Sequence, residues 1–253
     1  MPNRFAAWLS ACGGDDVEVD SSEVRDALIA AREQLPKVHA LFIGDITYEE
    51  CEVSWIQNTD LSPLLSAYGN LTHFGVRGGS GLSLGQLDLS ELVELQVQAG
   101  GLSAEVVREV MKARLPKLEH LELYLGTDNY GATSSVDDLT PLLDGTLFPR
   151  LKYLGLKNSD YQDAIAQVIA DAPALDGLET LDLSMGTLSD EGGQALLGSE
   201  RVKTLSKLDL HHHFMSDEMM QKLEGLGIEV DVSEQEESDE DDGEVWRYVA
   251  LGE

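Results

Sequence analysis

Basic residues are scarce in this chain relative to acidic ones. The 253 residues include 17 Lys and Arg against 47 Asp and Glu, so the formal net charge is −30. A charge of this size and sign repels nucleic-acid phosphates and anionic lipid, and it favours a basic or mixed-charge partner. The same charge could also serve solubility alone. The sequence therefore predicts a protein partner and no contact with nucleic acid or membrane.

Cysteines and long apolar runs are also scarce. Cys12 and Cys51 are the two cysteines of the sequence, and they lack a Cys-x-x-Cys spacing. We therefore expect neither a disulfide scaffold nor a zinc site, and a reducing, cytoplasmic environment. No apolar run approaches the roughly 20 residues that span a bilayer. The segment at 9–12 resembles a lipoprotein cleavage box, but the apolar stretch before it is too short to favour export.

Sequence motifs of common enzyme classes are missing as well. The chain contains no His-Glu-x-x-His. Arg77-Gly-Gly-Ser-Gly81 is rich in glycine but lacks the Lys-Ser/Thr that completes a phosphate-binding loop, so a tight turn after a strand explains it better. We therefore predict a protein that is not an enzyme, with no catalytic residue and no cofactor.

What the chain does contain is a repeated pattern of leucines. Segments of the form Leu-x-x-Leu-x-Leu, or close apolar variants, recur at 38–43, 71–76, 92–97, 118–123, 151–156, 178–183 and 205–210. A unit of this kind cannot bury its own apolar face and must stack on its neighbours. The pattern predicts an α/β fold, namely a right-handed leucine-rich repeat solenoid, or horseshoe. Parallel strands would line its concave face and helices its convex face.

Helical segments follow most of the predicted strands. Ser103, Asp160 and Ser216 are expected to open helices, because each precedes apolar residues at helical spacing and Ser and Asp are good N-caps. The step from Arg77 to Ser90 is too short for a full helix. We also expect Phe5, Trp8 and Leu9 to form one face of a short helix at the N-terminus.

The composition divides the chain into three parts. Residues 1–35 are predicted to be an N-terminal capping segment with a helix near 22–34. Residues 36–232 form the solenoid, about seven repeats and a final strand at 228–232. Residues 233–253 form an acidic tail, with eight acids in residues 234–244, followed by Val-Trp-Arg-Tyr-Val at 245–249. This last motif is expected to fold back on the last repeat as a strand or hook; a partner-binding motif is the alternative.

The outward positions of the strands supply the candidate binding residues. Tyr124 and Tyr153 are predicted to project from adjacent strands as an exposed central patch, because tyrosine and arginine dominate protein interfaces. The alternative is that these side chains only cover the sheet. The predicted partner-binding residues are Arg77, His120, Glu122, Tyr124, Tyr153, Lys157, Asp182, Asp209 and His211.

Three consecutive histidines, 211–213, raise the question of a metal site. Neighbouring strand residues point to opposite faces, so His211 alone should face the concave side near Asp209 and Asp182, and we predict no metal. His213 is expected to pack or hydrogen-bond in the turn. The alternative to a binding module is an accessory or catalytic subunit of a modification enzyme that uses the Asp182, Asp209 and His211 face, where neighbouring carboxylates shift each other's pKa. A third possibility is a structural element of a larger assembly.

Several longer strings carry a family resemblance over residues 20–253. They are Asp45-Ile-Thr-Tyr-Glu-Glu-Cys-Glu52, Arg77-Gly-Gly-Ser-Gly81, Asp182-Leu-Ser-Met-Gly186, Leu208-Asp-Leu-His-His-His-Phe214 and Asp242-Gly-Glu-Val-Trp-Arg-Tyr-Val249. Together they resemble an uncharacterised bacterial family of cytosolic, ribonuclease-inhibitor-like leucine-rich repeat proteins. The resemblance implies a soluble solenoid without assigned catalytic activity. The chain departs from the family at its N-terminus, where relatives carry a longer lead segment with an extra strand.

Overall fold

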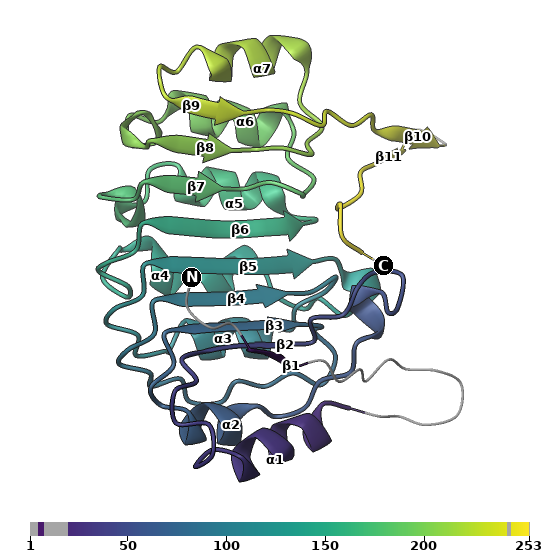
Figure 1. Ribbon diagram of the computed structural model, residues 1–253. Helices are drawn as coiled ribbons and strands as arrows, with labels where there is room; N and C mark the ends of the chain where they lie inside the picture. The colour runs from purple at the N-terminus through teal and green to yellow at the C-terminus, as the bar shows by residue number, and fades with distance from the viewer. Residues whose placement is uncertain (1–4, 8–19, 242–243, 253) are drawn as a thin grey trace.

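The fold is built on one large parallel sheet whose strands follow one another in chain order. The computed structural model describes residues 5–7, 20–241 and 244–252. Its large sheet has nine strands in the order β1 to β9 (Figure 1). Their bounds are β1 Phe5–Ala7, β2 Ala40–Ile43, β3 His73–Arg77, β4 Glu94–Gln98, β5 His120–Gly126, β6 Tyr153–Ser159, β7 Thr180–Asp182, β8 Lys207–Asp209 and β9 Glu229–Asp231. The seven repeat strands and the final strand predicted from the leucine pattern are confirmed.

Helices cover the other side of the repeats. They are α1 Ser22–Ala30, α2 Ser62–Ala67, α3 Ala104–Val110, α4 Thr140–Leu143, α5 Gln162–Ile169, α6 Asp190–Gly198 and α7 Asp217–Glu224. Figure 1 shows α3, α5 and α6 on one face of the sheet, which leaves the other face open. Residues 78–93 contain no helix, as their short length predicted. The chain is therefore an α/β leucine-rich repeat solenoid.

The repeated leucines share one core between the sheet and the helices. Leu121, Leu154 and Leu181 are partners in register on β5, β6 and β7, and each is completely buried. The same apolar cluster extends from Val38 to Leu223. Stacking of identical positions thus buries what one repeat could not bury alone, and it leaves the alternate residues of every strand on the open face.

Two of the three expected helix starts are confirmed. The hydroxyl oxygens of Ser103 and Ser216 accept hydrogen bonds from backbone N–H groups three residues later. The start at Asp160 is wrong by one residue, because Tyr161 is the N-cap of α5. The carboxylate of Asp160 accepts hydrogen bonds from Thr127 and from the backbone of Asp128 instead.

The N-terminal segment corrects two expectations. Phe5 lies in a strand and not in a helix, because residues 5–7 pair in parallel with β2, Phe5 opposite Leu41. Trp8 and Leu9, predicted to share its helix face, lie outside the described residues. Cys51 is disulfide-bonded, and its partner lies outside the described residues. The expectation of no disulfide was wrong because it used sequence spacing, which does not detect pairs that the fold brings together.

The C-terminal segment runs much further than a hook on the last repeat. β10 Asp239–Asp241 and β11 Glu244–Trp246 form an antiparallel hairpin. Residues 247–252, here called the strap, then follow the edge of the sheet at which the parallel strands end (Figure 1). The strap contacts the turns after β8 and β7 and then Asn158 near the end of β6. The carbonyl of Gly252 accepts a hydrogen bond from the hydroxyl of Ser54, near the first repeats. None of the helices in the described ranges is long and apolar enough to cross a membrane.

Candidate interaction face

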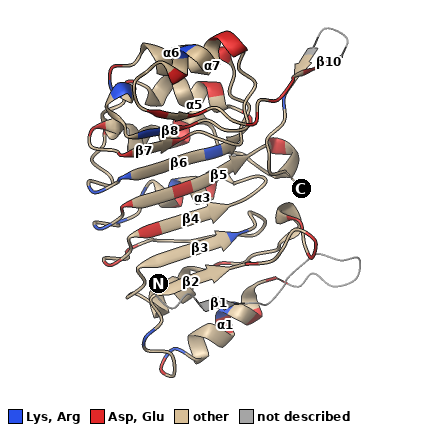
Figure 2. Ribbon diagram, turned by 45° about the horizontal axis from the view of Figure 1, so that its top comes forward, with Lys and Arg blue, Asp and Glu red and all other residues tan. Residues whose placement is uncertain are grey.

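The open face of the sheet carries a line of carboxylates in register. On β7, β8 and β9, Asp182 lies opposite Asp209, and Asp209 lies opposite Asp231. Gly155 of β6 separates Asp182 from Glu122 of β5. We call Glu122, Asp182, Asp209 and Asp231 the acidic stripe. Figure 2 shows acidic positions on β4 and β5 and basic positions on β3 and β6. Glu122, Asp182 and Asp209 are largely buried and Asp231 is half-exposed, so the stripe contributes negative potential beneath the open face and exposes its carboxylate mainly at β9.

Asp182 is the centre of a dense hydrogen-bond network. Its Oδ1 accepts from the backbone N–H and the hydroxyl of Ser184, at 3.0 and 2.5 Å. Its Oδ2 accepts from the hydroxyl of Tyr153 at 2.5 Å and lies 2.9 Å from Nζ of Lys157. The side chains of both ions are more than nine-tenths buried. A carboxylate with this many donors is held rigidly in one orientation.

Glu122 forms the second half of this central arrangement. Its Oε1 accepts from the amide of Gln96 at 2.9 Å, and its Oε2 lies 3.3 Å from Nε2 of His120. The His120 ring stacks on the ring of Tyr153, with 4.0 Å between their centroids. The ammonium group of Lys157 lies 5.3 Å from the centre of the Tyr124 ring. The predicted residues of β5 and β6 therefore do come together.

The electrostatics of this centre favour charged carboxylates and neutral phenols. Burial alone would raise the pKa of Glu122, but hydrogen bonds from His120 and Gln96 and the charge of Lys157 bring it below 4.5. Burial raises the pKa of Tyr153, and the negative charge of Asp182 adds to this effect. Burial and the charge of Glu122 raise the pKa of Tyr124 in the same way. Both phenols therefore remain protonated donors at neutral pH.

The prediction that the central tyrosines form an exposed patch is wrong for Tyr124. Its side chain is 8% exposed, and Tyr153 is half-buried. Lys157 is 7% exposed. The strand pattern correctly gave the face on which these residues lie. It did not show that neighbouring outward side chains would pair and cover one another, because their contacts depend on rotamers across strands.

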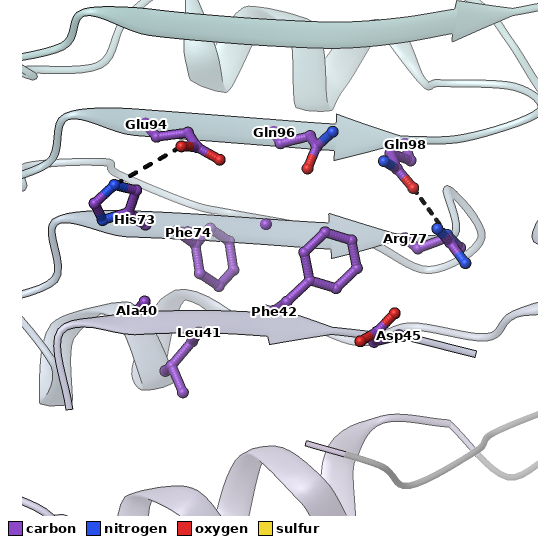
Figure 3. A pocket seen from close by; sticks show the side chains of 11 residues that line it. Ala40, Leu41, Phe42, Asp45, His73, Phe74, Arg77, Glu94, Gln96 and Gln98 are labelled. Carbon is purple, nitrogen blue, oxygen red and sulfur yellow. Dashed lines mark hydrogen bonds and ion pairs between the residues drawn. The ribbon is translucent and has the colours of Figure 1, made fainter. Parts of the chain in front are cut away.

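Arg77 does not join the central arrangement through hydrogen bonds. Its Nε donates to Gln98 at 2.8 Å and its Nη1 to the backbone carbonyl of Ile46 at 2.6 Å. It forms one end of a hollow of about 200 Å³ on β2, β3 and β4 (Figure 3). Gly75 leaves the middle of this region without a side chain, and a Cβ there would lie 2.3 Å from the ring of Phe42. The ring of Phe42 thus covers Gly75 and forms an apolar wall.

This hollow was not identified from the sequence, although its signal was present. Phe42, Gly75 and Gln96 all occupy the middle outward column of the strands. A glycine between two larger residues in one column predicts a depression, because neighbouring side chains cannot fill the missing volume completely. The half-exposed Phe42 and Gln96 are therefore candidate contact residues in addition to the predicted set.

The last two strands hold a second group of titratable side chains. Asp209 Oδ2 accepts from Nζ of Lys207 at 2.8 Å, and its Oδ1 lies 2.7 Å from Nδ1 of His211. Burial alone would raise the pKa of Asp209, but these two partners lower it. One ligand atom each from Asp209, His211 and Asp231 lies within 4.8 Å of the others, a spacing at which the three could hold a metal ion.

His213 behaves as the sequence predicted. Its imidazole is completely buried in the turn after β8. Nδ1 accepts a hydrogen bond from the backbone N–H of Met215 at 3.1 Å, so Nε2 carries the proton and donates to the carbonyl of Val232 at 3.0 Å. Burial lowers the pKa of His213 below 6.5. The neutral ring therefore closes the turn structurally.

Comparison with solved structures supports the architecture. A crystal structure of a protein from Bacteroides fragilis, a structural-genomics target, matches 92% of this chain with a TM-score of 0.85 and 33% sequence identity. The chain spans 66% of the length of that protein. An internalin from Listeria monocytogenes matches 78% of this chain and 48% of its own length, with a TM-score of 0.42 and 17% identity. No protein-family model and no curated protein matches the chain.

Proposed function

We propose that this chain is a non-catalytic protein-interaction module that binds a basic or mixed-charge protein partner on its concave strand face. The observation that carries the proposal is the acidic stripe, which runs in register from β5 to β9. A solenoid presents such a face as an extended surface, and binding on that surface is the common use of its curvature.

The charge of the stripe favours a basic partner. Hydrogen bonds and nearby cations lower the pKa of Glu122 and Asp209, and hydrogen bonds from Ser233 lower that of Asp231. These carboxylates are therefore ionised at neutral pH. Lys157 and Lys207 offset part of this charge locally, while the whole chain carries −30. Complementary charge mainly increases the association rate and the selectivity for basic partners.

The hollow on β2–β4 supplies the apolar part of such an interface. Phe42 is half-exposed beside it, and Arg77 and Gln96 provide polar groups at its rim. Protein interfaces concentrate their binding energy in apolar or aromatic anchors that fit a pocket, surrounded by polar contacts. The partner that fits this face would place one apolar side chain in the hollow and basic side chains near Glu229 and Asp231, where the acidic face is exposed.

The network around Asp182 supports binding over catalysis. A general base needs a lone pair directed at a substrate proton. Both oxygens of Asp182 already accept hydrogen bonds or contact an ammonium group, from Ser184, Tyr153 and Lys157. The side chain is 3% exposed, so it stabilises the face from within and does not contact a ligand directly.

Charge reversal at the exposed end of the stripe tests the proposal. Glu229 is exposed and Asp231 half-exposed on β9, so the double variant Glu229→Lys/Asp231→Lys should fold normally. Immobilised protein is used to capture partners from an extract of the source cells, and the stoichiometric partner is quantified by mass spectrometry. We expect at least tenfold lower recovery with this variant.

The matched control places the same charge change on the convex side. Glu105 on α3 and Glu218 on α7 are both exposed. Glu105→Lys/Glu218→Lys should leave recovery of the partner close to that of the original chain. If the convex variant loses the partner and the concave variant retains it, the binding face has been assigned to the wrong side.

A second candidate function uses the Asp182, Asp209 and His211 face in an accessory or catalytic subunit of a modification enzyme. The contact of His211 with Asp209, and Asp231 on the neighbouring strand, favour it as a metal-assisted site. Calorimetric titration with Zn²⁺ and Mn²⁺ tests this candidate. Stoichiometric binding that is lost in Asp231→Asn would favour the second candidate; heat signals equal to those of buffer would exclude metal binding by these residues.

Family membership and location form part of the same proposal. We propose that the chain belongs to the bacterial family of cytosolic leucine-rich repeat proteins that its sequence resembles, and the 33% identity to the B. fragilis protein supports this. A cytosolic location implies that Cys51, which is disulfide-bonded in the structure, is reduced in the cell. Thiol titration of protein isolated with an alkylating reagent decides the location: an alkylated Cys51 supports the cytoplasm.

A further inference from the structure

Left-handed backbone conformations recur at one position of the repeat. The position lies two residues beyond the last core residue of a repeat strand. Four residues other than glycine occupy it with positive φ values, namely Asn158 (54°), Met185 (68°), His212 (55°) and Glu234 (59°). Gly78 occupies the same position after β3, with a φ of 98°. Left-handed conformations are unfavourable for residues other than glycine, and they often mark functional sites. These residues form a ladder along the sheet edge at which the strands end.

The strap binds to successive steps of this ladder. The carbonyl of Tyr248 lies 3.1 Å from Nε2 of His212. The N–H of Ala250 donates to the carbonyl of Met185 at 2.8 Å. One repeat further, Leu251 contacts Asn158. The left-handed turns thus direct backbone and side-chain groups toward an extended chain that crosses the repeats.

Asn158 recognises the main chain of the strap at two points. Its Oδ1 accepts from the N–H of Leu251 at 2.8 Å, and its Nδ2 donates to the carbonyl of Leu251 at 2.6 Å. Asn158 is completely buried with the strap in place, and loss of the strap would remove both of these hydrogen bonds. Both hydrogen bonds involve main-chain atoms of Leu251, so this contact recognises an extended peptide independently of its side chain.

The strap lies in a groove along this ladder, and Gly100 lies next to the strap at the end of this groove. A Cβ on Gly100 would lie 2.2 Å from the hydroxyl of Ser54 and 2.5 Å from the carbonyl of Gly252. Absence of a side chain at Gly100 therefore permits the strap backbone to approach the turn after β4. The groove is fitted to an extended main chain at this end as well.

The side chains of the strap contribute little burial. Val245 and Trp246, just before the strap, and Tyr248 within it are each more than half exposed. Leu251 is half-buried at a hollow of about 260 Å³, whose apolar lining includes Ile46 and Val53. Main-chain hydrogen bonds therefore hold the strap, and the aliphatic side chain of Leu251 lines one wall of the adjoining hollow.

Charge adds a second side-chain preference. Nη1 of Arg247 lies 3.7 Å from Oδ2 of Asp163, at the opposite end of the strap from Leu251. The preceding linker is strongly acidic, with Asp239–Asp241 in β10. The groove thus favours a basic residue at the position of Arg247, next to Asp163, and a large aliphatic residue four positions later, at the position of Leu251 beside the hollow.

We propose that the groove along the left-handed ladder is a binding site for an extended peptide segment of a partner protein, and that residues 247–252 are its built-in, exchangeable occupant. The partner segment would carry a basic residue at the position of Arg247 and a large aliphatic residue at that of Leu251. This site lies at the edge of the sheet, so it does not depend on binding at the concave face. Because the strap is tethered, its high effective concentration keeps the groove closed until a stronger segment competes.

Peptide exchange in the full-length protein tests the proposal. The variant Ala250→Pro/Leu251→Asp removes the N–H that donates to Met185 and replaces the aliphatic side chain, and it weakens the strap. A fluorescein-labelled peptide with the sequence of residues 244–253 is the probe, and fluorescence anisotropy measures its binding. We expect the probe to bind the strap-weakened protein at least tenfold more tightly than the original chain.

Matched variants show whether the ladder is the site. In the strap-weakened protein, Asn158→Gly preserves the left-handed backbone but removes the side-chain amide. It should lower the affinity of the protein for the probe about tenfold or more. Glu234→Gly changes the same ladder position in the last repeat, away from the strap, and should leave binding unchanged. A probe with Asp at the position of Leu251 should bind poorly.

Two results would overturn the proposal. One is the absence of probe binding to the strap-weakened protein, or binding that Asn158→Gly does not change. The other comes from light scattering of the original chain: a dimer that dissociates in the strap-weakened variant would assign the groove to the strap of a second copy and not to a partner. A monomer at all concentrations, together with probe exchange, supports a partner segment.

Discussion

The hydroxyl of Tyr153 on β6 donates a hydrogen bond to Oδ2 of Asp182 on β7, at a distance of 2.5 Å. The same oxygen lies 2.9 Å from the ammonium group of Lys157. Both residues lie on the concave face, where the sequence placed them, yet they are bound to one another. The middle of this face is thus a rigid, internally paired surface, while its two ends hold the more exposed side chains.

Replacing Asp182 should destabilise the fold more than replacing its tyrosine partner. Asp182→Ala leaves the buried ammonium group of Lys157 without its partner carboxylate, so we expect a loss of about 3–5 kcal/mol in the free energy of unfolding. Tyr153→Phe removes one of several donors and should cost about 1.5 kcal/mol. Urea denaturation followed by far-UV circular dichroism measures both values.

A paired replacement separates lost charge pairing from lost packing. In Asp182→Leu/Lys157→Met, neither ion remains, and apolar side chains of similar length take their places. Much of the stability should return, because removal of both partners leaves no buried unpaired charge. A double variant as unstable as Asp182→Ala would show that the ion pair is not the source of the effect.

The strands and their face were predictable because the leucine spacing is a local and repeated signal. The pattern placed Leu121, Leu154 and Leu181 in the core and Tyr124 on the opposite face, and the structure agrees. The burial of Tyr124 was not predictable, since it depends on contacts between rotamers of neighbouring strands. The pairing of Asn158 with Leu251, 93 residues apart, left no local signal.

Strand β1, near the N-terminus, is a second feature that the local sequence pattern could not predict. A segment of three residues pairs with β2 through backbone hydrogen bonds, and backbone pairing is largely independent of side-chain identity. The apolar pattern of residues 5–9 was compatible with a helix as well as a strand. For so short a run, the neighbouring strand decides the conformation, and periodicity does not.

Acid should destabilise the fold through His213. Burial lowers the pKa of this imidazole below its ordinary 6.5, with an additional effect from His212, while the carbonyl of Val232, Asp190 and Asp231 act in the opposite direction. In the unfolded chain the ring takes up a proton at higher pH than in the folded chain. Stability is therefore fully present above pH 6.5 and is lost as the pH falls from 6.5 toward the lower folded pKa.

The variant His213→Gln isolates this contribution. Glutamine retains a donor for the carbonyl of Val232 but does not titrate, so the decrease in unfolding free energy below pH 6.5 should be smaller than in the original chain. His39→Gln, which replaces an exposed histidine far from the turn after β8, is the control for removal of one imidazole. Urea midpoints at pH 5 to 8 provide the measurement; equal slopes for all three proteins would exclude His213 as the group responsible.

Partner binding should depend on the aromatic wall of the hollow on β2–β4. Phe42→Ala removes the ring that covers Gly75, and we expect binding of a partner at this face to weaken by about 2 kcal/mol, roughly thirtyfold. Stability should change little, because Phe42 is only half-buried. Surface plasmon resonance with the captured partner measures the affinity. Trp55→Ala, which removes a 56% exposed aromatic outside the hollow, is the control that should bind normally.

The end of β5 should tolerate no side chain at its last residue, Gly126. This glycine has a φ of 74°, and a Cβ there would lie 1.9 Å from the carbonyl oxygen of Gly100, whose turn supports the strap. Gly126→Ala therefore combines an unfavourable left-handed conformation with a backbone clash, and it should lower the free energy of unfolding by about 2–4 kcal/mol.

Gly131→Ala is the matched control, because Gly131 has a φ of 90° with no atom of the described residues within 4 Å of its added Cβ. It should cost about 1 kcal/mol. Thermal and urea denaturation compare the two, and equal losses would mean that conformation alone, and not the contact between the turns, requires glycine at position 126.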